Sequence, residues 1–159
     1  MVRMAMMIAI VFVATNIRVH IPLGQGGLVH IGTLAMFAIA LKYGPLHGAL
    51  SGGIGMALFD VLSGWAAWAP ATLIIRLLAG ALVGYLADRG DSPSLLKNFG
   101  AIIPGGVVIV AGYFIFETLF ISHYSAALLS VPGNLTQIGI GVLSVFVMQS
   151  LPDMEEANA

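Results

Sequence analysis

Charged side chains are too few for this chain to fold as a soluble domain. Six Lys and Arg and seven Asp and Glu stand among 159 residues, or 8% of the chain, whereas a soluble domain carries about 25%. Apolar residues make up 59%, and the mean hydropathy is +1.02. Most of the surface must therefore face the hydrocarbon of a lipid bilayer, and the sequence predicts an all-α integral membrane protein.

Turn residues divide the apolar sequence into six predicted transmembrane helices. At about 20 residues per span the chain has no length left for a soluble domain, so residues 1–159 are expected to form a single membrane domain. The first segment is interpreted as a span rather than as a cleaved signal peptide, because more apolar sequence follows it. The predicted helices cover residues 2–18, 32–43, 46–62, 71–87, 99–122 and 134–151.

The cations between these helices predict the orientation in the membrane. Arg3, Lys42, Arg89 and Lys97 fall on one side of a six-helix chain, and Arg18 falls on the other. Cytoplasmic loops carry the excess of Lys and Arg, so both termini are expected to be cytoplasmic. The glycines of residues 24–27 then face outside, where their backbone freedom predicts a lid over a binding site.

Several polar side chains lie near the outer ends of the predicted helices, whereas the inner halves are apolar. Polar groups inside a span are costly, so their depth is informative. They predict a polar cup that opens to the outside, although residues at helix ends can also simply reach water. The candidate substrate-binding residues are Asn16, His30, Trp68, Arg76, Tyr113, Glu117, Asn134 and Gln137.

Two ionisable residues flank the tryptophan-containing loop of this cup. Asp60 ends one predicted helix and Arg76 lies within the first two turns of the next, and an ion pair between them would offset two desolvation costs at once. Whether Arg76 contacts a ligand or only Asp60 stays open. If Asp60 neutralises Arg76, we expect a largely uncharged aromatic heterocycle as the ligand.

The sequence lacks the residues that metal, ATP and nucleic-acid sites require. Cysteine is absent, and the four histidines have no i, i+4 partner, so no metal site and no cofactor are expected. The sequence has no Walker A motif for ATP. A net charge of −1 without a basic run gives no nucleic-acid footprint.

A small-xxx-small pattern and four further motifs carry a family resemblance. Ala5 and Ala9 are spaced so that another helix can approach closely in lipid. The further motifs begin at His30, Tyr43, Asp60 and Trp68, and the last of them ends at Arg76. They read HIG, then YGPLHGALSGGIG, then DVLSG and WAPATLIIR. Together these motifs resemble the substrate-binding S component of an energy-coupling factor (ECF) vitamin transporter.

The resemblance implies a function without catalysis. An S component captures a vitamin from outside and docks, here through Ala5 and Ala9, on a membrane T subunit that is driven by two cytoplasmic ATPases. It implies the plasma membrane of a bacterium. Members that bind hydroxymethylpyrimidine or pyridoxine look most similar, and Arg76 stands where members often have Lys.

Two other classes of function remain as alternatives. An intramembrane enzyme would need a nucleophile and base or two catalytic carboxylates, and Asp60 and Glu117 match no such motif. A self-contained channel or exporter would need polar residues along its full depth, and the sequence lacks such a track.

Overall fold

The computed structural model describes residues 1–20, 28–121 and 123–153. Within these ranges the chain is almost entirely helical, with one short antiparallel pair of strands that joins Arg18 to His30. The elements are α1 (Val2–Asn16), β1 (Arg18–His20), β2 (Leu28–His30), α2 (Gly32–Tyr43), α3 (Pro45–Leu62), α4 (Ala69–Leu86), α5 (Leu95–Phe116), the π-helical turn η1 (Glu117–Ile121), α6 (Tyr124–Gly141), α7 (Ser144–Val147) and the 3₁₀ turn η2 (Met148–Ser150).

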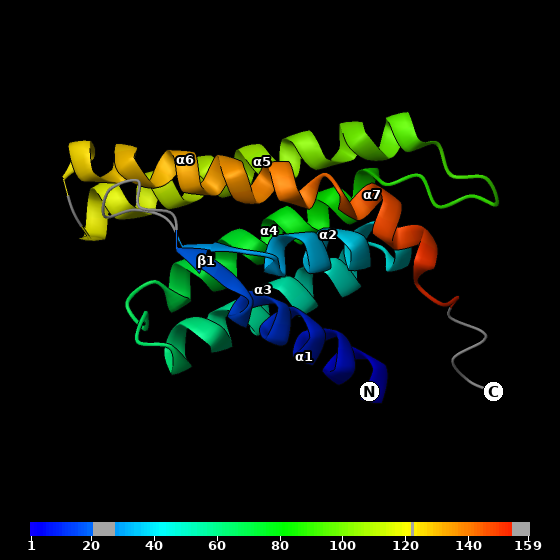
Figure 1. Cartoon of the computed structure of the whole chain (residues 1–159), viewed down its shortest axis with the longest axis horizontal. Coiled ribbons are helices and arrows are strands. Elements are labelled where there is room, and N and C mark those ends of the chain that lie inside the picture. Colours follow the sequence, from blue (N-terminus) through cyan, green and yellow to red (C-terminus); the bar gives the residue numbers. More distant parts are fainter. Residues whose placement is uncertain (21–27, 122, 154–159) are drawn as a thin grey trace.

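The long helices lie along one another (Figure 1). In this view α5 and α6 run along the top, α4 and α2 occupy the middle, and α1 and α3 lie below. The core forms where these helices meet. There Phe37 of α2 is fully buried, and it packs against Gly141 of α6.

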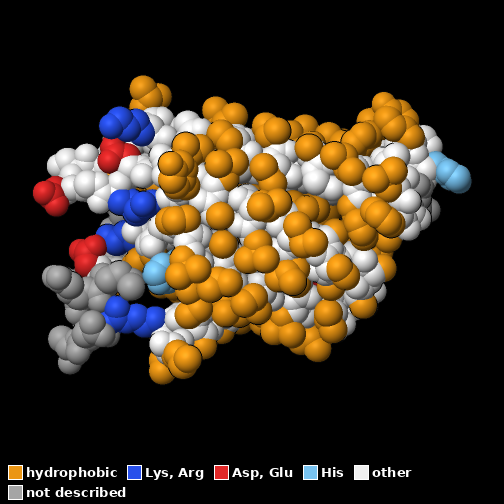
Figure 2. All heavy atoms as spheres, turned by 180° about the vertical axis from the view of Figure 1, so that it is seen from behind, with side chains coloured by type: hydrophobic (Ala, Val, Ile, Leu, Met, Phe, Trp, Pro, Cys, Tyr) orange, Lys and Arg blue, Asp and Glu red, His pale blue; other side chains and the backbone are white. Residues whose placement is uncertain are grey.

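Charge and apolar surface are separated along the molecule (Figure 2). A broad band of hydrophobic side chains covers most of this face, and Lys, Arg, Asp and Glu gather at one end. This charged end holds the ion pair between Lys42 and Asp153 and a second pair between Lys97 and Asp88. Such a distribution is typical of a protein whose belt lies in lipid and whose end reaches water.

Three helical segments in the described part of the chain are long and apolar enough to cross a membrane: Ala69–Leu86, Leu95–Ile121 and Ala127–Ser150. Val2–Asn16 and Gly32–Tyr43 are apolar but shorter. An all-helical membrane protein is therefore confirmed. The expectation that all six helices span stays a prediction.

The last two predicted helices have different bounds in the structure. α5 begins at Leu95 rather than at residue 99, because the Ser94 hydroxyl caps it by accepting from the Lys97 N–H at 3.4 Å. α6 begins at Tyr124 rather than at residue 134, because Pro132 lies inside the helix instead of in a loop. Proline removes one helical hydrogen bond, and membrane helices tolerate that loss.

The bounds of the other predicted helices need smaller corrections. The first helix ends at Asn16, and Arg18 belongs to β1. α4 begins at Ala69, where Pro70 fits the first turn. The last predicted helix is interrupted after Gly141, so residues 144–150 form two short elements. The predicted lid at residues 24–27 lies outside the described residues.

Helices α3 and α4 approach each other at glycines. A methyl group at Gly80 would lie 2.4 Å from the Gly48 carbonyl oxygen, and one at Gly84 would lie 2.5 Å from the Gly44 carbonyl carbon. Gly44 also has a φ of 93°, which any other residue adopts only with strain, and it turns α2 into α3. Small residues allow this close packing in lipid, where apolar side chains gain little by leaving the solvent.

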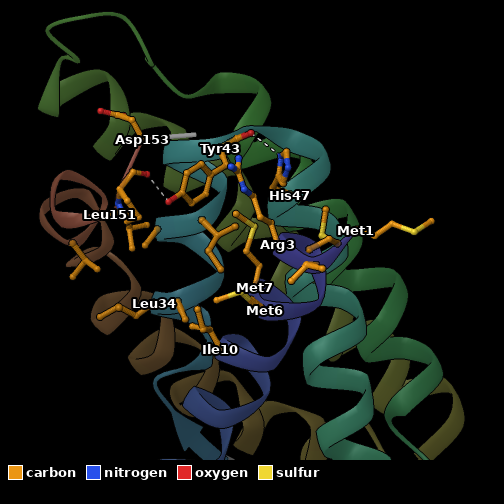
Figure 3. Close-up of a pocket in the computed structure, with 17 residues that line it drawn as sticks. Met1, Arg3, Met6, Met7, Ile10, Leu34, Tyr43, His47, Leu151 and Asp153 are labelled. Carbon is orange, nitrogen blue, oxygen red and sulfur yellow. Dashed lines mark hydrogen bonds between the residues drawn. The ribbon is translucent and has the colours of Figure 1, made fainter. Parts of the chain in front are cut away.

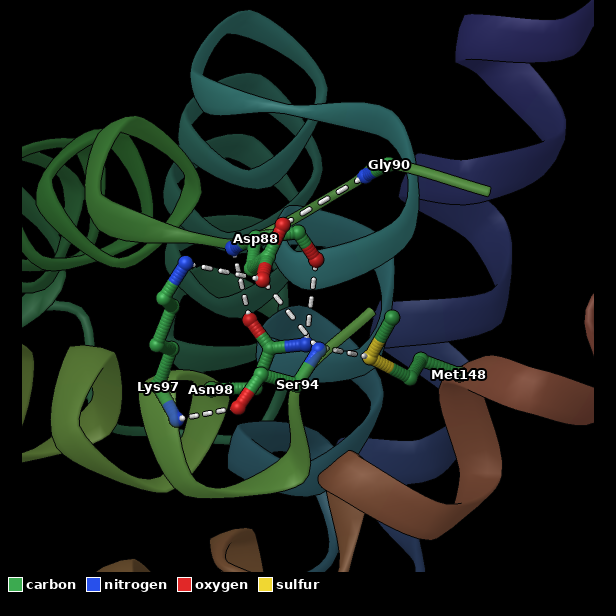
Figure 4. A network of polar contacts seen from close by, with 6 residues as sticks. All are labelled: Asp88, Gly90, Ser94, Lys97, Asn98 and Met148. Carbon is green, nitrogen blue, oxygen red and sulfur yellow. Dashed lines mark hydrogen bonds and ion pairs between the residues drawn. The ribbon is translucent and has the colours of Figure 1, made fainter. Parts of the chain in front are cut away.

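A polar network anchors the loop between α4 and α5 at the charged end (Figure 4). The fully buried Asn98 accepts from the Asp88 N–H at 2.8 Å and donates to the Asp88 carbonyl at 3.1 Å. The N–H groups of Ser94 and Gly90, together with Lys97, hold the pKa of the Asp88 carboxyl below its usual range. The contacts of the Asp88 carboxylate with Ser94, Gly90 and Lys97 are therefore present at neutral pH and are lost as the pH falls through that lowered pKa, whereas the hydrogen bonds of Asn98 to the Asp88 backbone do not titrate.

We expect Gly80→Ala to lower the free energy of unfolding by about 1–3 kcal/mol, because the added methyl group meets backbone atoms that must shift. Thermal unfolding in detergent measures the change. Gly100→Ala in α5 is the control, since nothing lies within 4 Å of the added carbon, and it should be neutral or stabilising. Equal effects of the two substitutions would contradict the close packing.

Candidate functional site

A buried arginine organises the polar residues of the helical bundle. Arg76 lies two turns into α4 and is only 1% exposed. Its side chain forms hydrogen bonds with residues of α2, α5 and α6. The hydroxyl groups of Tyr113 and Thr72 connect it to Asp60 of α3. The residues that we call the Arg76 cluster are Thr33, Asp60, Thr72, Arg76, Tyr113 and Gln137.

One side of the cluster is a closed ring of hydrogen bonds. Arg76 Nη1 donates to the Thr33 hydroxyl at 2.9 Å, and Nη2 donates to Gln137 Oε1 at 3.2 Å. The Thr33 hydroxyl donates in turn to the same Gln137 oxygen at 3.0 Å. Because a guanidinium only donates, the atom of Gln137 that faces Arg76 must be the amide oxygen. The ring therefore fixes the orientation of the Gln137 amide.

The other side of the cluster is a directed chain of hydroxyl groups. Arg76 Nε donates to the Tyr113 hydroxyl at a long 3.4 Å, and Tyr113 donates to Thr72 Oγ1 at 2.9 Å. Thr72 then donates to Asp60 Oδ2 at 2.5 Å. Every donor in this chain points from the cation toward the carboxylate, so each hydrogen bond polarises the next.

The predicted direct ion pair between Asp60 and Arg76 is wrong. In the described part of the chain no direct contact joins the two groups, and the side chains of Thr72 and Tyr113 lie between them. Asp60 lies two residues before the end of α3 and Arg76 lies two turns into α4. Their spacing along the sequence could not give the distance between them. The carboxylate therefore compensates the guanidinium through a relay.

Neutral acceptors and an aromatic face stabilise the buried cation. The guanidinium carbon of Arg76 lies 5.3 Å from the centre of the Tyr113 ring, within the range of a cation–π interaction. Three of the five N–H groups of an arginine donate to the cluster. Burial of a charge is costly without such partners, so any loss among them should destabilise the site.

A second hydrogen-bonded pair, Trp68 and Glu117, lies at the end of the bundle beyond this cluster. Trp68 Nε1, just before α4, donates to Glu117 Oε1 at 3.2 Å. Trp65 packs edge to face against Trp68, with ring centres 5.3 Å apart. The structure thus brings the predicted residues Trp68 and Glu117 into contact and adds Trp65 beside them.

Two other predicted residues, Asn16 and His30, are placed differently. Asn16 is exposed and donates to the Phe12 carbonyl at 2.8 Å, so the structure does not bring it into the cluster. His30 is buried, and burial together with the Arg76 charge lowers its pKa to about 3. Its neutral ring accepts from the Gly32 N–H through Nδ1 at 3.2 Å, which leaves the proton on Nε2.

Asn134 and Gln137 do not begin their helix as predicted. Both are buried in the second half of α6, one turn apart, at 8% and 4% exposure. The i, i+3 spacing correctly places them on one face of the helix. Gln137 joins the Arg76 cluster, and Asn134 follows the same face one turn closer to Glu117.

Sequence analysis missed Thr33 and Thr72. Both hydroxyls are buried and bridge charged or amide partners. Thr72 precedes Arg76 by four residues and shares its face of α4, so the i, i+4 rule could have found it. Thr33 lies far from every partner in the sequence, and only the packing of α2 against α4 and α6 reveals it.

The Arg76 cluster and the neighbouring pair of Trp68 and Glu117 together suit the recognition of a polar ring. Indole and phenol rings lie beside amides, hydroxyls and carboxylates, the mixture that binding sites for small heterocycles use. Among the described residues, no group of three His, Asp or Glu side chains could hold a metal ion. Fold and cluster together define a helical membrane protein with a buried polar site toward the end opposite its charged end.

The chain belongs to a known family of such proteins. The family model of the ECF-type riboflavin transporter S component matches residues 1–150. This match confirms the family resemblance, and the members of that family are non-catalytic, substrate-binding membrane subunits of ECF transporters. The alternatives of an intramembrane enzyme and of a self-contained channel are thereby set aside.

One curated relative also matches part of the chain. An uncharacterised protein from Pyrococcus woesei is 38% identical over 101 residues, which cover 61% of this chain and 63% of the relative. The chain thus spans less than two thirds of that relative's length. The likeness supports a shared fold over the matched part and says nothing of a ligand.

We expect Tyr113→Phe to lower the free energy of unfolding by about 1–3 kcal/mol, because Thr72 and Arg76 each lose a buried partner. Thermal unfolding of the purified protein measures the change. Tyr85→Phe is the matched control, since the Tyr85 side chain is 75% exposed on α4. A loss no greater than that of the control would show that the relay does not stabilise the fold.

Proposed function

We propose that this protein captures an uncharged, heteroaromatic vitamin at the Arg76 cluster and delivers it to an ECF transport module. The observation that carries the proposal is the convergence of buried polar side chains from α2, α4, α5 and α6 on one place in an otherwise apolar bundle. Such groups are costly in a membrane unless they serve a site. The relay from Asp60 compensates the arginine charge, which favours an uncharged ligand.

Riboflavin is the first candidate ligand, because the family description names it. Hydroxymethylpyrimidine and pyridoxine, which the sequence favoured, are the second candidates. All are ring systems with hydrogen-bonding edges. Trp68 and Tyr113 would offer apolar faces to the ring, and Glu117, Asn134 and Gln137 would offer hydrogen bonds at its edge.

The charged end supports an orientation with the site open to the outside. Arg3, Lys42, Arg89 and Lys97 belong to that end, through the start of α1, the end of α2, the loop after α4 and the start of α5. By the positive-inside rule this end faces the cytoplasm, and both termini lie there. On α2, Thr33 precedes Lys42 by nine residues, or about 13 Å, so the cluster lies toward the outer side.

The exposed face of α1 supports docking to a T subunit. Ala5 and Ala9 are both exposed, and the larger side chains of Met6 and Val13 flank them on the same helix. A surface of small residues in lipid lets the backbone of another helix approach. We assign this face to the T subunit, which two cytoplasmic ATPases would drive.

We predict that titration of the purified protein with riboflavin gives saturable binding, followed by flavin fluorescence. Gln137→Ala should weaken it by about 1–3 kcal/mol, because the cluster loses the amide that Arg76 orients. Gln149→Ala in η2, at the charged end, is the control and should bind normally. Binding of hydroxymethylpyrimidine or pyridoxine instead would reassign the vitamin, and binding of only an anion such as pantothenate would contradict the compensated charge.

We predict that Ala9→Trp abolishes vitamin uptake by cells and leaves ligand binding by the isolated protein intact. The indole would hold the T subunit away from α1. Uptake of labelled vitamin and binding by the purified chain are measured for the same variant. Ala111→Trp, which adds the same bulk to an exposed position of α5, should preserve uptake. Equal loss in both variants would sink the assignment of the α1 face.

A further inference from the structure

Arg76 lies behind the residues that a ligand would meet. Its side chain is 1% exposed and donates hydrogen bonds to Thr33, Tyr113 and Gln137. Trp68 and Glu117, which lie beyond the cluster, are only partly buried. A ring that enters from this end meets the partners of Arg76 before the guanidinium, so Arg76 acts on it through its charge.

The net charge of the Arg76 cluster depends on a single carboxylate. The three side chains that accept directly from Arg76 are neutral. Among the described residues, no ion pair involves Arg76 or Asp60. Asp60 carries the one negative charge of the cluster, and the hydroxyl groups of Thr72 and Tyr113 link it to the guanidinium. The cluster is therefore neutral as a whole only while Asp60 is charged.

Burial makes this balance of charge important for a ligand. Thr72 is 2% exposed and Tyr113 is 8% exposed, so water and salt screen the relay poorly. Charges interact much more strongly in such an interior than in water. Without the carboxylate, the guanidinium would attract a negatively charged ligand into the cluster.

We propose that Asp60 determines which ligand charge this protein accepts, and that it does so through the relay rather than by contact with the ligand. The carboxylate cancels the guanidinium, so a neutral heteroaromatic ring binds and a negatively charged ring is rejected. Removal of this one charge converts the site into one that favours an anion. The inference rests on the proposed capture of a vitamin at the Arg76 cluster, and it assigns the selection to α3, which supplies none of the proposed ligand contacts.

Riboflavin provides a matched pair of ligands for the test, because its two oxidation states differ in charge. The oxidised ring is neutral, whereas the ring that has taken up two electrons becomes an anion once it loses the proton at N1. The midpoint potential of bound riboflavin is compared with that of free riboflavin at a pH where the reduced ring is an anion. The difference gives the ratio of the affinities for the two states. A purely structural defect weakens both states alike and leaves the potential unchanged.

We expect the wild-type protein to bind the neutral ring more tightly, so the bound potential lies below that of free riboflavin. Asp60→Asn should shift the affinity ratio about tenfold toward the anion, because a nearby negative charge is removed. For a two-electron couple this raises the midpoint potential by about 30 mV. Thr72→Val, which breaks the relay, should shift the potential in the same direction, and Thr72→Ser, which keeps the hydroxyl, should not.

Asp153→Asn is the matched control, because it removes a carboxylate that also compensates a cation. Asp153 pairs with Lys42 at 2.5 Å. Together with Tyr43, it lines a groove at the charged end (Figure 3). Lys42 follows Thr33 by nine residues on α2, or about 13 Å along the helix. The potential of bound riboflavin should therefore keep its wild-type value in this variant.

The possible outcomes separate this inference from the proposed function. An unchanged potential in Asp60→Asn, or an equal rise in Asp153→Asn, would overturn the inference alone. If Asp60→Asn fails to show cooperative unfolding, Thr72→Val against Thr72→Ser decides. If the wild-type protein binds riboflavin in neither state, pyridoxine and pyridoxic acid, which share one ring without and with a carboxylate, replace the pair in the same variants. A wild-type protein that binds neither riboflavin nor pyridoxine contradicts the proposed function, and this inference with it.

Discussion

The buried guanidinium of Arg76 is the constraint on which the outer half of this protein depends. A permanent charge at 1% exposure in a membrane protein needs a shell of acceptors. Thr33, Tyr113 and Gln137 provide that shell from three different helices. Because each acceptor sits at a fixed place on its helix, the arginine sets the relative positions of α2, α4, α5 and α6. The residues that could hold a vitamin are thereby held in place as well.

The two halves of the bundle are held together by different interactions. Toward the charged end, Gly48 and Gly80 bring α3 and α4 into backbone contact, and the packing itself provides the attraction. Toward the other end, the hydrogen bonds of the Arg76 cluster join the helices in addition to close packing. Apolar association in lipid lacks the hydrophobic effect, so both kinds of contact are needed to fix one arrangement of mostly apolar helices.

Much of this fold could be predicted because periodicity and turns are local properties. Residues 32–43 match α2 fully, and the turn at Gly44 and Pro45 places α3 within one residue. Pro132 misled the prediction for α6, because its sequence pattern resembles a loop and only packing keeps it helical. At the site, side-chain type identified Arg76, Tyr113 and Gln137. The partners of Arg76 depend on which helices touch, so the relay through Thr72 replaced the predicted ion pair, and Asn16 fell outside the cluster.

The relay from Arg76 to Asp60 is tested most directly by a double-mutant cycle in two backgrounds. The free energies of unfolding of Asp60→Asn, Arg76→Gln and the double variant are measured with Tyr113 present and again with Tyr113→Phe. The account predicts a coupling of about 0.5–3 kcal/mol between the two charges when Tyr113 is present, and its loss when the hydroxyl is removed. An unchanged coupling without that hydroxyl would mean that the charges interact directly, and no coupling in either background would mean that Asp60 does not compensate Arg76.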